Sequence, residues 1–114
     1  MSNYGEMPIG DGVPKYAVIE ATPGDNELVA AVSGKSIKVF SYVIIPTAST
    51  ATARFESGAG GTALTGVIDL NSDIPMSADF NPGGHFQTEK GDALSLEVAN
   101  NNIRGHLTYM EVDA

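Results

Sequence analysis

Residues 36–45 read Ser-Ile-Lys-Val-Phe-Ser-Tyr-Val-Ile-Ile, a run dominated by β-branched and aromatic residues. Such residues favour extended backbone, in which successive side chains point to opposite faces. One face then carries the odd-numbered side chains from Ile37 to Ile45, and the other carries the even-numbered ones from Lys38 to Ile44. Because both faces hold apolar side chains, the run predicts a central strand.

Outward from this run, short strands and turns alternate along the chain. We expect strands at 16–21, 27–32, 36–45, 52–57, 63–70, 74–78, 85–88, 94–99 and 103–109. No stretch has the sustained apolar period of a helix. Turn signals at this spacing predict an all-β protein, a jelly-roll-like antiparallel β-sandwich of eight or nine short strands, although other Greek-key sandwiches fit the same pattern.

Three segments have the composition of particular turns. Residues 22–25 (Thr-Pro-Gly-Asp) and 81–84 (Asn-Pro-Gly-Gly) have proline second and glycine third, which is the signature of a type II turn. Residues 100–102 are three asparagines, and asparagine tolerates the positive φ that tight turns need.

The first fifteen residues differ from the rest, because glycine and proline at positions 5, 8, 10, 12 and 14 break any regular element. One interpretation is a frayed terminus; the other is an extended arm that orders against a neighbouring subunit. We therefore divide the chain into an extended N-terminal arm (residues 1–15) and a β-sandwich domain (residues 16–114). The residues expected to contact a partner are Tyr4, Met7, Pro8, Ile9 and Val13.

Composition narrows the possible partners. The 114 residues suit one domain, and the absence of cysteine removes disulfide and thiolate chemistry. Fourteen acidic residues against six basic ones give a net charge of −8, which disfavours nucleic acid and anionic membranes as partners. The chain starts without a signal-peptide pattern, and its longest apolar run is too short to span a bilayer. We expect synthesis in the cytoplasm.

Two glycine-containing stretches resemble nucleotide-binding motifs but lack essential parts. Gly34-Lys35-Ser36 ends like a phosphate-binding loop, yet Val29 stands where that loop needs its first glycine. Gly58 and Gly60 have the spacing of a dinucleotide-binding turn, but strand-forming residues follow instead of a helix. We expect no bound nucleotide and no other cofactor.

Residues 69–73 (Asp-Leu-Asn-Ser-Asp) have the spacing of the first calcium ligands of an EF-hand. Ile74 and Phe80 replace the glycine and the glutamate that the motif requires. We expect a polar turn in which asparagine and aspartate bond their own backbone, and a looser calcium site on this loop stays open.

His85 and His106 are the only histidines, and neither is spaced from a serine in a recognisable nucleophile elbow. We expect no enzyme activity, no catalytic residues and no metal site, although a site built from both histidines and an aspartate stays open. The chain has no tryptophan, which disfavours without eliminating a platform for carbohydrate binding.

Residues 54–58 (Arg-Phe-Glu-Ser-Gly) followed by 62–66 (Thr-Ala-Leu-Thr-Gly) resemble a strand and loop of small phage-encoded proteins. The resemblance continues through 81–88 (Asn-Pro-Gly-Gly-His-Phe-Gln-Thr), 91–96 (Gly-Asp-Ala-Leu-Ser-Leu) and 105–112 (Gly-His-Leu-Thr-Tyr-Met-Glu-Val). It covers roughly residues 35 to 112 and contains no catalytic motif. The family is that of small phage virion structural proteins of the capsid decoration or cement type.

The resemblance implies a non-enzymatic protein that binds the outer surface of a phage capsid and stabilises it. Its implied partners are the major capsid protein and further copies of itself, with a homotrimer favoured, and its implied location is the virion. The alternative is a receptor- or glycan-binding β module of a tail fibre, with a site near residues 69–73 or 81–86.

Overall fold

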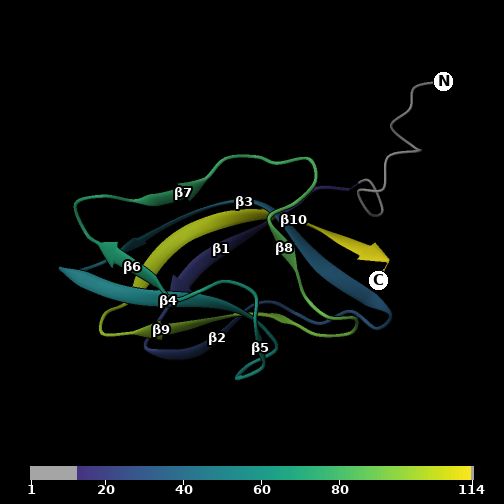
Figure 1. Cartoon of the computed structure of the whole chain (residues 1–114), viewed down its shortest axis with the longest axis horizontal. Coiled ribbons are helices and arrows are strands. Elements are labelled where there is room, and N and C mark those ends of the chain that lie inside the picture. The colour runs from purple at the N-terminus through teal and green to yellow at the C-terminus, as the bar shows by residue number, and fades with distance from the viewer. Residues whose placement is uncertain (1–12, 114) are drawn as a thin grey trace.

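The computed structural model describes residues 13–113, in which ten strands form two antiparallel sheets packed face to face (Figure 1). The strands are β1 (Lys15–Ala21), β2 (Gly24–Val29), β3 (Lys35–Pro46), β4 (Thr50–Ser57), β5 (Thr62–Ala63), β6 (Ile68–Asn71), β7 (Met76–Ala78), β8 (Phe86–Gln87), β9 (Leu94–Ala99) and β10 (Ile103–Asp113). The predicted all-β sandwich is therefore confirmed.

The order of the strands defines a jelly roll. One sheet runs β1-β10-β3-β7, with β8 also paired to β3, and the other runs β2-β9-β4-β5, with β6 also paired to β4. The chain crosses from sheet to sheet between β1, β2, β3 and β4, and the last strand returns to pair with the first. Two Greek keys wound in this way are the jelly-roll arrangement.

The bounds of most strands differ from the expected ones, and two of these differences have a clear physical cause. The stretch 63–70 is divided into β5 and β6, because the Thr65 hydroxyl accepts the Phe55 N–H (3.2 Å) and takes the place of a ladder partner. The stretch 27–32 is shifted toward the N-terminus, since β2 pairs with β9 from Gly24 onward. Its expected end forms a turn, in which the Lys35 N–H donates to the Val32 carbonyl (3.0 Å).

The prediction that residues 36–45 form a central strand is confirmed, because β3 pairs with β10 on one side and with β7 and β8 on the other. The prediction that side chains along this run alternate strictly between the two faces was wrong, because the register with β10 shifts at Phe40. A bulge adds one residue to a strand and reverses the faces beyond it. Ile37 and Val39 therefore share the core with Ile44, while Phe40 joins a separate buried cluster with Met110.

The main core lies between the sheets and draws on both. Phe55 of β4 is fully buried, and its ring lies 5.0 Å from that of Tyr42 and 4.9 Å from that of Phe86. Aromatic pairs at such distances add to the stabilisation that burial gives. The two sheets are thus joined through one continuous apolar cluster.

Two of the predicted turns have the expected backbone, and one does not. Gly24 has φ +111° and Asn100 has φ +83°, as positive-φ turn positions require. In the turn of residues 81–84 the positive φ falls on Gly84, one residue later than in a type II turn. Here the Asn81 side chain accepts the Gly83 N–H (2.9 Å) and closes the turn locally.

The expected N-terminal arm falls almost entirely outside the described residues. Tyr4, Met7, Pro8 and Ile9 lie outside them, and Val13, which is 52% exposed, is the expected contact residue that the structure describes. Strand β1 begins at Lys15, one residue before the expected boundary.

Candidate functional site

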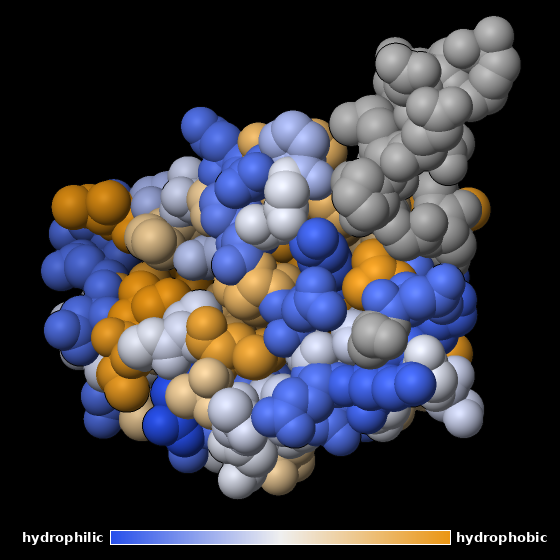
Figure 2. Space-filling view, turned by 45° about the vertical axis from the view of Figure 1, so that its right-hand side comes forward, coloured by the Kyte–Doolittle hydropathy of each residue, from blue (hydrophilic) through white to orange (hydrophobic). Residues whose placement is uncertain are grey.

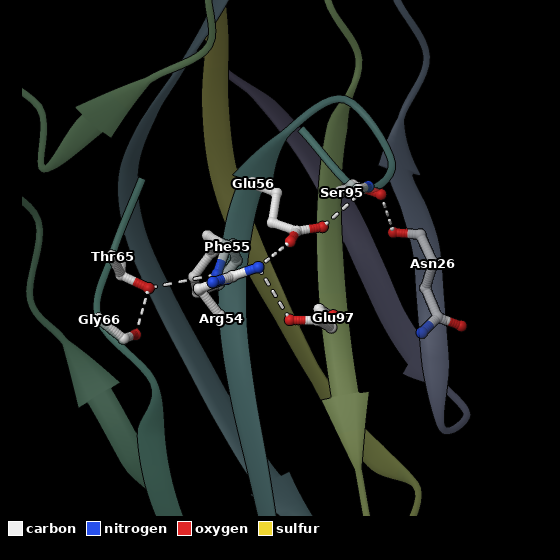
Figure 3. Close-up of polar contacts among 9 residues, drawn as sticks. Asn26, Arg54, Phe55, Glu56, Thr65, Gly66, Ser95 and Glu97 are labelled. Carbon is white, nitrogen blue, oxygen red and sulfur yellow. Dashed lines mark hydrogen bonds and ion pairs between the residues drawn. The ribbon is translucent and has the colours of Figure 1, made fainter. Parts of the chain in front are cut away.

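Four charged side chains, those of Asp25, Arg54, Glu56 and Glu97, gather on the outer face of the sheet formed by β2, β9 and β4. Figure 3 shows three of them, Arg54, Glu56 and Glu97. The strand register places Asp25 opposite Glu97, and Glu97 opposite Arg54, in one row across three strands. Glu56 lies two positions along β4 from Arg54, on the same face. We call these four residues the acidic cluster.

Arg54 links two of the carboxylates. Its Nη2 atom lies 2.6 Å from Glu56 Oε2 and 3.0 Å from Glu97 Oε1. The bond to Glu56 raises the pKa of Arg54, since it favours the charged guanidinium. Charge-assisted bonds of this length are stronger than neutral ones, so Arg54 fixes β4 to β9 at this point.

Glu56 is fully buried although it lies on the outer face of its sheet. The turn between β4 and β5 approaches it, and the Gly60 N–H donates to Glu56 Oε1 (3.2 Å). A buried carboxylate is costly unless it is paired and hydrogen-bonded, and Arg54 and Gly60 supply these contacts.

Asp25 has its pKa raised, first by a side-chain hydrogen bond with Glu56 and then by burial and the nearby negative charges. A hydrogen bond between two carboxyl groups requires a proton on one of them. Asp25 therefore binds a proton more tightly here than a separate aspartate would.

One oxygen from each of Asp25, Glu56 and Glu97 lies within 4.8 Å of the others, which among residues 13–113 is the one such group of three ligand-type side chains. Oxygen clusters suit hard cations. Here the guanidinium of Arg54 already contacts two of the three carboxylates. The positive charge of Arg54 thus compensates the negative charges of Glu56 and Glu97. We assign the acidic cluster a structural role.

The sequence interpretation missed the acidic cluster. The alternation of Arg54 and Glu56 with apolar neighbours indicates that both leave the core, and Glu97 shows the same pattern. Which of them meet depends on strand register, and no local pattern specifies the pairing of β4 with β9 and β2.

The two histidines and the aspartates of residues 69–73, which the sequence suggested as possible metal ligands, lie outside the acidic cluster. His85 Nε2 lies 2.7 Å from the Asp79 carbonyl, and His106 stands on β10 opposite Val18 and Val43. Neither histidine belongs to the group of three described above. Residues 69–71 belong to strand β6 and not to the predicted loop. At the end of this strand Asn71 Oδ1 accepts the Asp73 N–H (2.9 Å), which is the kind of side-chain bond to nearby backbone that the sequence predicted.

A shallow hollow of about 230 Å³ lies where the β1–β2, β3–β4 and β9–β10 connections meet. Its lining is mostly polar and comprises Glu20, Ala21, Thr22, Thr47, Asn102, Ile103 and Arg104. Pockets for drug-sized ligands are roughly 300–1,000 Å³, so the hollow suits at most a small polar group.

Comparisons of the chain with protein-family models, with curated proteins and with solved structures gave no match. Within residues 13–113 no helix is long and apolar enough to cross a membrane.

Proposed function

We propose that this chain is a non-enzymatic structural protein of a phage particle, a decoration or cement protein. It binds the outer surface of the capsid as an oligomer, a homotrimer in the favoured form, and stabilises the shell. Its partners are the major capsid protein and further copies of the chain, and it works in the virion.

The observation that carries the proposal is the exposure of apolar side chains on β1. Tyr16 is 78% exposed and Val18 is 74% exposed, on a protein whose net charge is −8. On the face drawn in Figure 2, hydrophobic patches likewise interrupt a mostly hydrophilic surface. Apolar surface that persists on so charged a protein is typical of a protein–protein contact.

The fold is compatible with this role but does not select it. Jelly rolls serve as viral capsid domains and as lectin domains, and one fold hosts many functions. The acidic cluster supports a structural role, because its one cation is already bonded to Glu56 and Glu97. Burial of Glu56 beneath the β4–β5 turn also keeps it from a substrate.

The test combines binding with mass. The full chain is mixed with expanded capsids of the phage that encodes it, from which the decoration layer has been stripped, and the mixture is sedimented. Light scattering after size-exclusion chromatography gives the mass of the free protein. We expect saturable co-sedimentation and an oligomer. A strict monomer that stays in the supernatant would sink the proposal.

The second candidate is a receptor- or glycan-binding module of a tail fibre, and the polar hollow beside Glu20, Asn102 and Arg104 favours it. This hollow differs from the two loops that the sequence indicated. A glycan array probed with and without calcium distinguishes the candidates, because saturable binding of one sugar favours the fibre. Neighbouring genes give independent information: a major capsid gene favours decoration, and tail genes favour the fibre.

A further inference from the structure

The shallow hollow at one end of the sandwich, which we call the polar hollow, lies where β1 and β3 end and β10 begins (Figure 1). Hydrogen bonds of the main chain hold the connections around it in place. The Thr47 N–H donates to the Asn102 carbonyl (2.9 Å), and the Thr22 N–H donates to the side chain of Asn26 (3.1 Å). The frame of the polar hollow is therefore formed before any ligand arrives, which lowers the entropic cost of binding.

The polar side chains that line the hollow are not engaged by the protein itself. They belong to Glu20, Thr22, Thr47, Asn102 and Arg104. Within the part of the chain that the structure describes, none of these five side chains has a hydrogen-bond or ion-pair partner. In the acidic cluster, by contrast, Arg54 is bonded to two carboxylates. Polar groups that converge on one hollow without pairing among themselves are available to a ligand.

The two charges at the polar hollow offset each other. Strand register sets Glu20 of β1 opposite Arg104 of β10, and these are the charged residues of the lining. A cationic ligand would be repelled by Arg104, and an anionic ligand by Glu20 and by a chain whose net charge is −8. A neutral polar ligand meets neither penalty.

The lining offers donors, acceptors and some apolar surface. The guanidinium of Arg104 only donates and the carboxylate of Glu20 only accepts, whereas hydroxyl and amide side chains do both. Ala21 and Ile103, which are 1% and 0% exposed, add apolar surface. A sugar combines the matching features, because its hydroxyls donate and accept and its C–H groups are apolar. The volume of about 230 Å³ limits the ligand to a single sugar unit.

We propose that the polar hollow binds one neutral sugar unit, with Arg104 donating to its oxygens, Glu20 accepting from its hydroxyls, and Asn102 doing either. The inference is independent of the decoration role. It rests on the second candidate function, the glycan-binding module, and deepens it by naming the class of sugar and the side chains that hold it.

The test is a titration of the full, isotope-labelled chain followed by nuclear magnetic resonance. The probes are glucose, galactose, mannose and N-acetylglucosamine, with glucuronic acid as the charged comparison and glycerol as a non-specific polyol. The hollow variants are Arg104→Gln and Asn102→Ala, both at exposed side chains. The matched control is Lys90→Gln, which removes one exposed positive charge outside the polar hollow.

We expect at least one of the four neutral sugars to cause saturable shifts of the backbone amide signals of Thr22, Thr47 and Ile103. Each hollow variant should weaken this binding by about tenfold, which is the loss expected when one hydrogen bond to the ligand is removed. Lys90→Gln should bind as the wild type does, and the unchanged spectrum outside the hollow shows that each variant is folded.

Four results would overturn the inference: no saturable shift with any neutral sugar, tighter binding of glucuronic acid, the same shifts with glycerol, or full affinity in Arg104→Gln. Saturable shifts centred on residues 69–73 or 81–86 would contradict the polar hollow and leave the second candidate function standing. Capsid sedimentation separates the decoration role. A wild type that pellets with capsids and binds no sugar contradicts this inference alone, and one that binds sugar in the hollow but ignores capsids contradicts only decoration.

Discussion

Asp25 and Asp113 affect the stability of the folded chain in opposite ways as the pH changes. The pKa of Asp25 is raised, above all by its hydrogen bond with Glu56, so the folded chain binds this proton more tightly than the unfolded chain. The pKa of Asp113 is lowered by its bond with Lys35, whose Nζ lies 2.6 Å from Asp113 Oδ1. Linkage then gives the two residues contributions to stability of opposite sign.

We predict that Asp25→Asn raises the free energy of unfolding above the raised pKa of Asp25, where the wild type holds the charged form beside Glu56 and Glu97. The gain should shrink as the pH falls through the raised pKa and vanish well below the ordinary value of 3.8, where Asp25 is protonated in both the folded and the unfolded chain. Urea unfolding of both proteins at a series of pH values measures the difference. A gain that grows as the pH falls would contradict the assignment.

Asp113→Asn is the matched control. The contribution of this residue is present above 3.8 and is lost as the pH falls through the lowered pKa of the folded chain. The variant should therefore be less stable than the wild type at neutral pH and equal to it in strong acid.

Strands β10 and β3 are the central pair of the sheet β1-β10-β3-β7, and the glycine at position 105 permits their close approach. A Cβ atom at Gly105 would lie 1.8 Å from the Val43 carbonyl oxygen on β3. Because this neighbour is backbone, the two strands have to move apart to admit a side chain.

We predict that Gly105→Ala lowers the free energy of unfolding by about 2 kcal/mol or more, the range for overpacking a tight contact. Gly66→Ala is the control, since a Cβ there meets nothing within 4 Å. It should change stability by less than about 1 kcal/mol. Equal losses in the two variants, measured by urea unfolding, would refute the close approach as the cause.

The molecule as a whole depends on one core shared by its two sheets. Phe55 of β4 contacts Tyr42 of β3 and Phe86 of β8, so its ring reaches across the sandwich. Elements that share a core are expected to unfold together.

We predict that Phe55→Ala lowers the free energy of unfolding by about 3–5 kcal/mol, as for other buried phenylalanines. Far-ultraviolet circular dichroism and tyrosine fluorescence should report the same midpoint in the wild type. Two separate transitions would show that the sheets unfold independently.

Local pattern was sufficient for much of the fold. The β-branched run of β3 predicted its central place, and the composition of residues 22–25 and 100–102 predicted positive φ where Gly24 and Asn100 have it. The predicted alternation of faces fails at Phe40, where a bulge in β3 reverses it. The predicted single strand over residues 63–70 fails at Thr65, whose side chain accepts a hydrogen bond in place of a backbone partner. Both departures depend on a partner strand distant in the sequence.

By itself, the sequence determined the strand-forming segments, the sandwich class and the acidic charge, because these follow from local propensity and composition. Only the tertiary structure decided which strands are neighbours. Register across β2, β9 and β4 brought Asp25, Glu97 and Arg54 into one row, and strand order set β1 and β7 at opposite edges of one sheet. The physical reason is that long-range pairing follows from burying one shared core, which the entire chain specifies together.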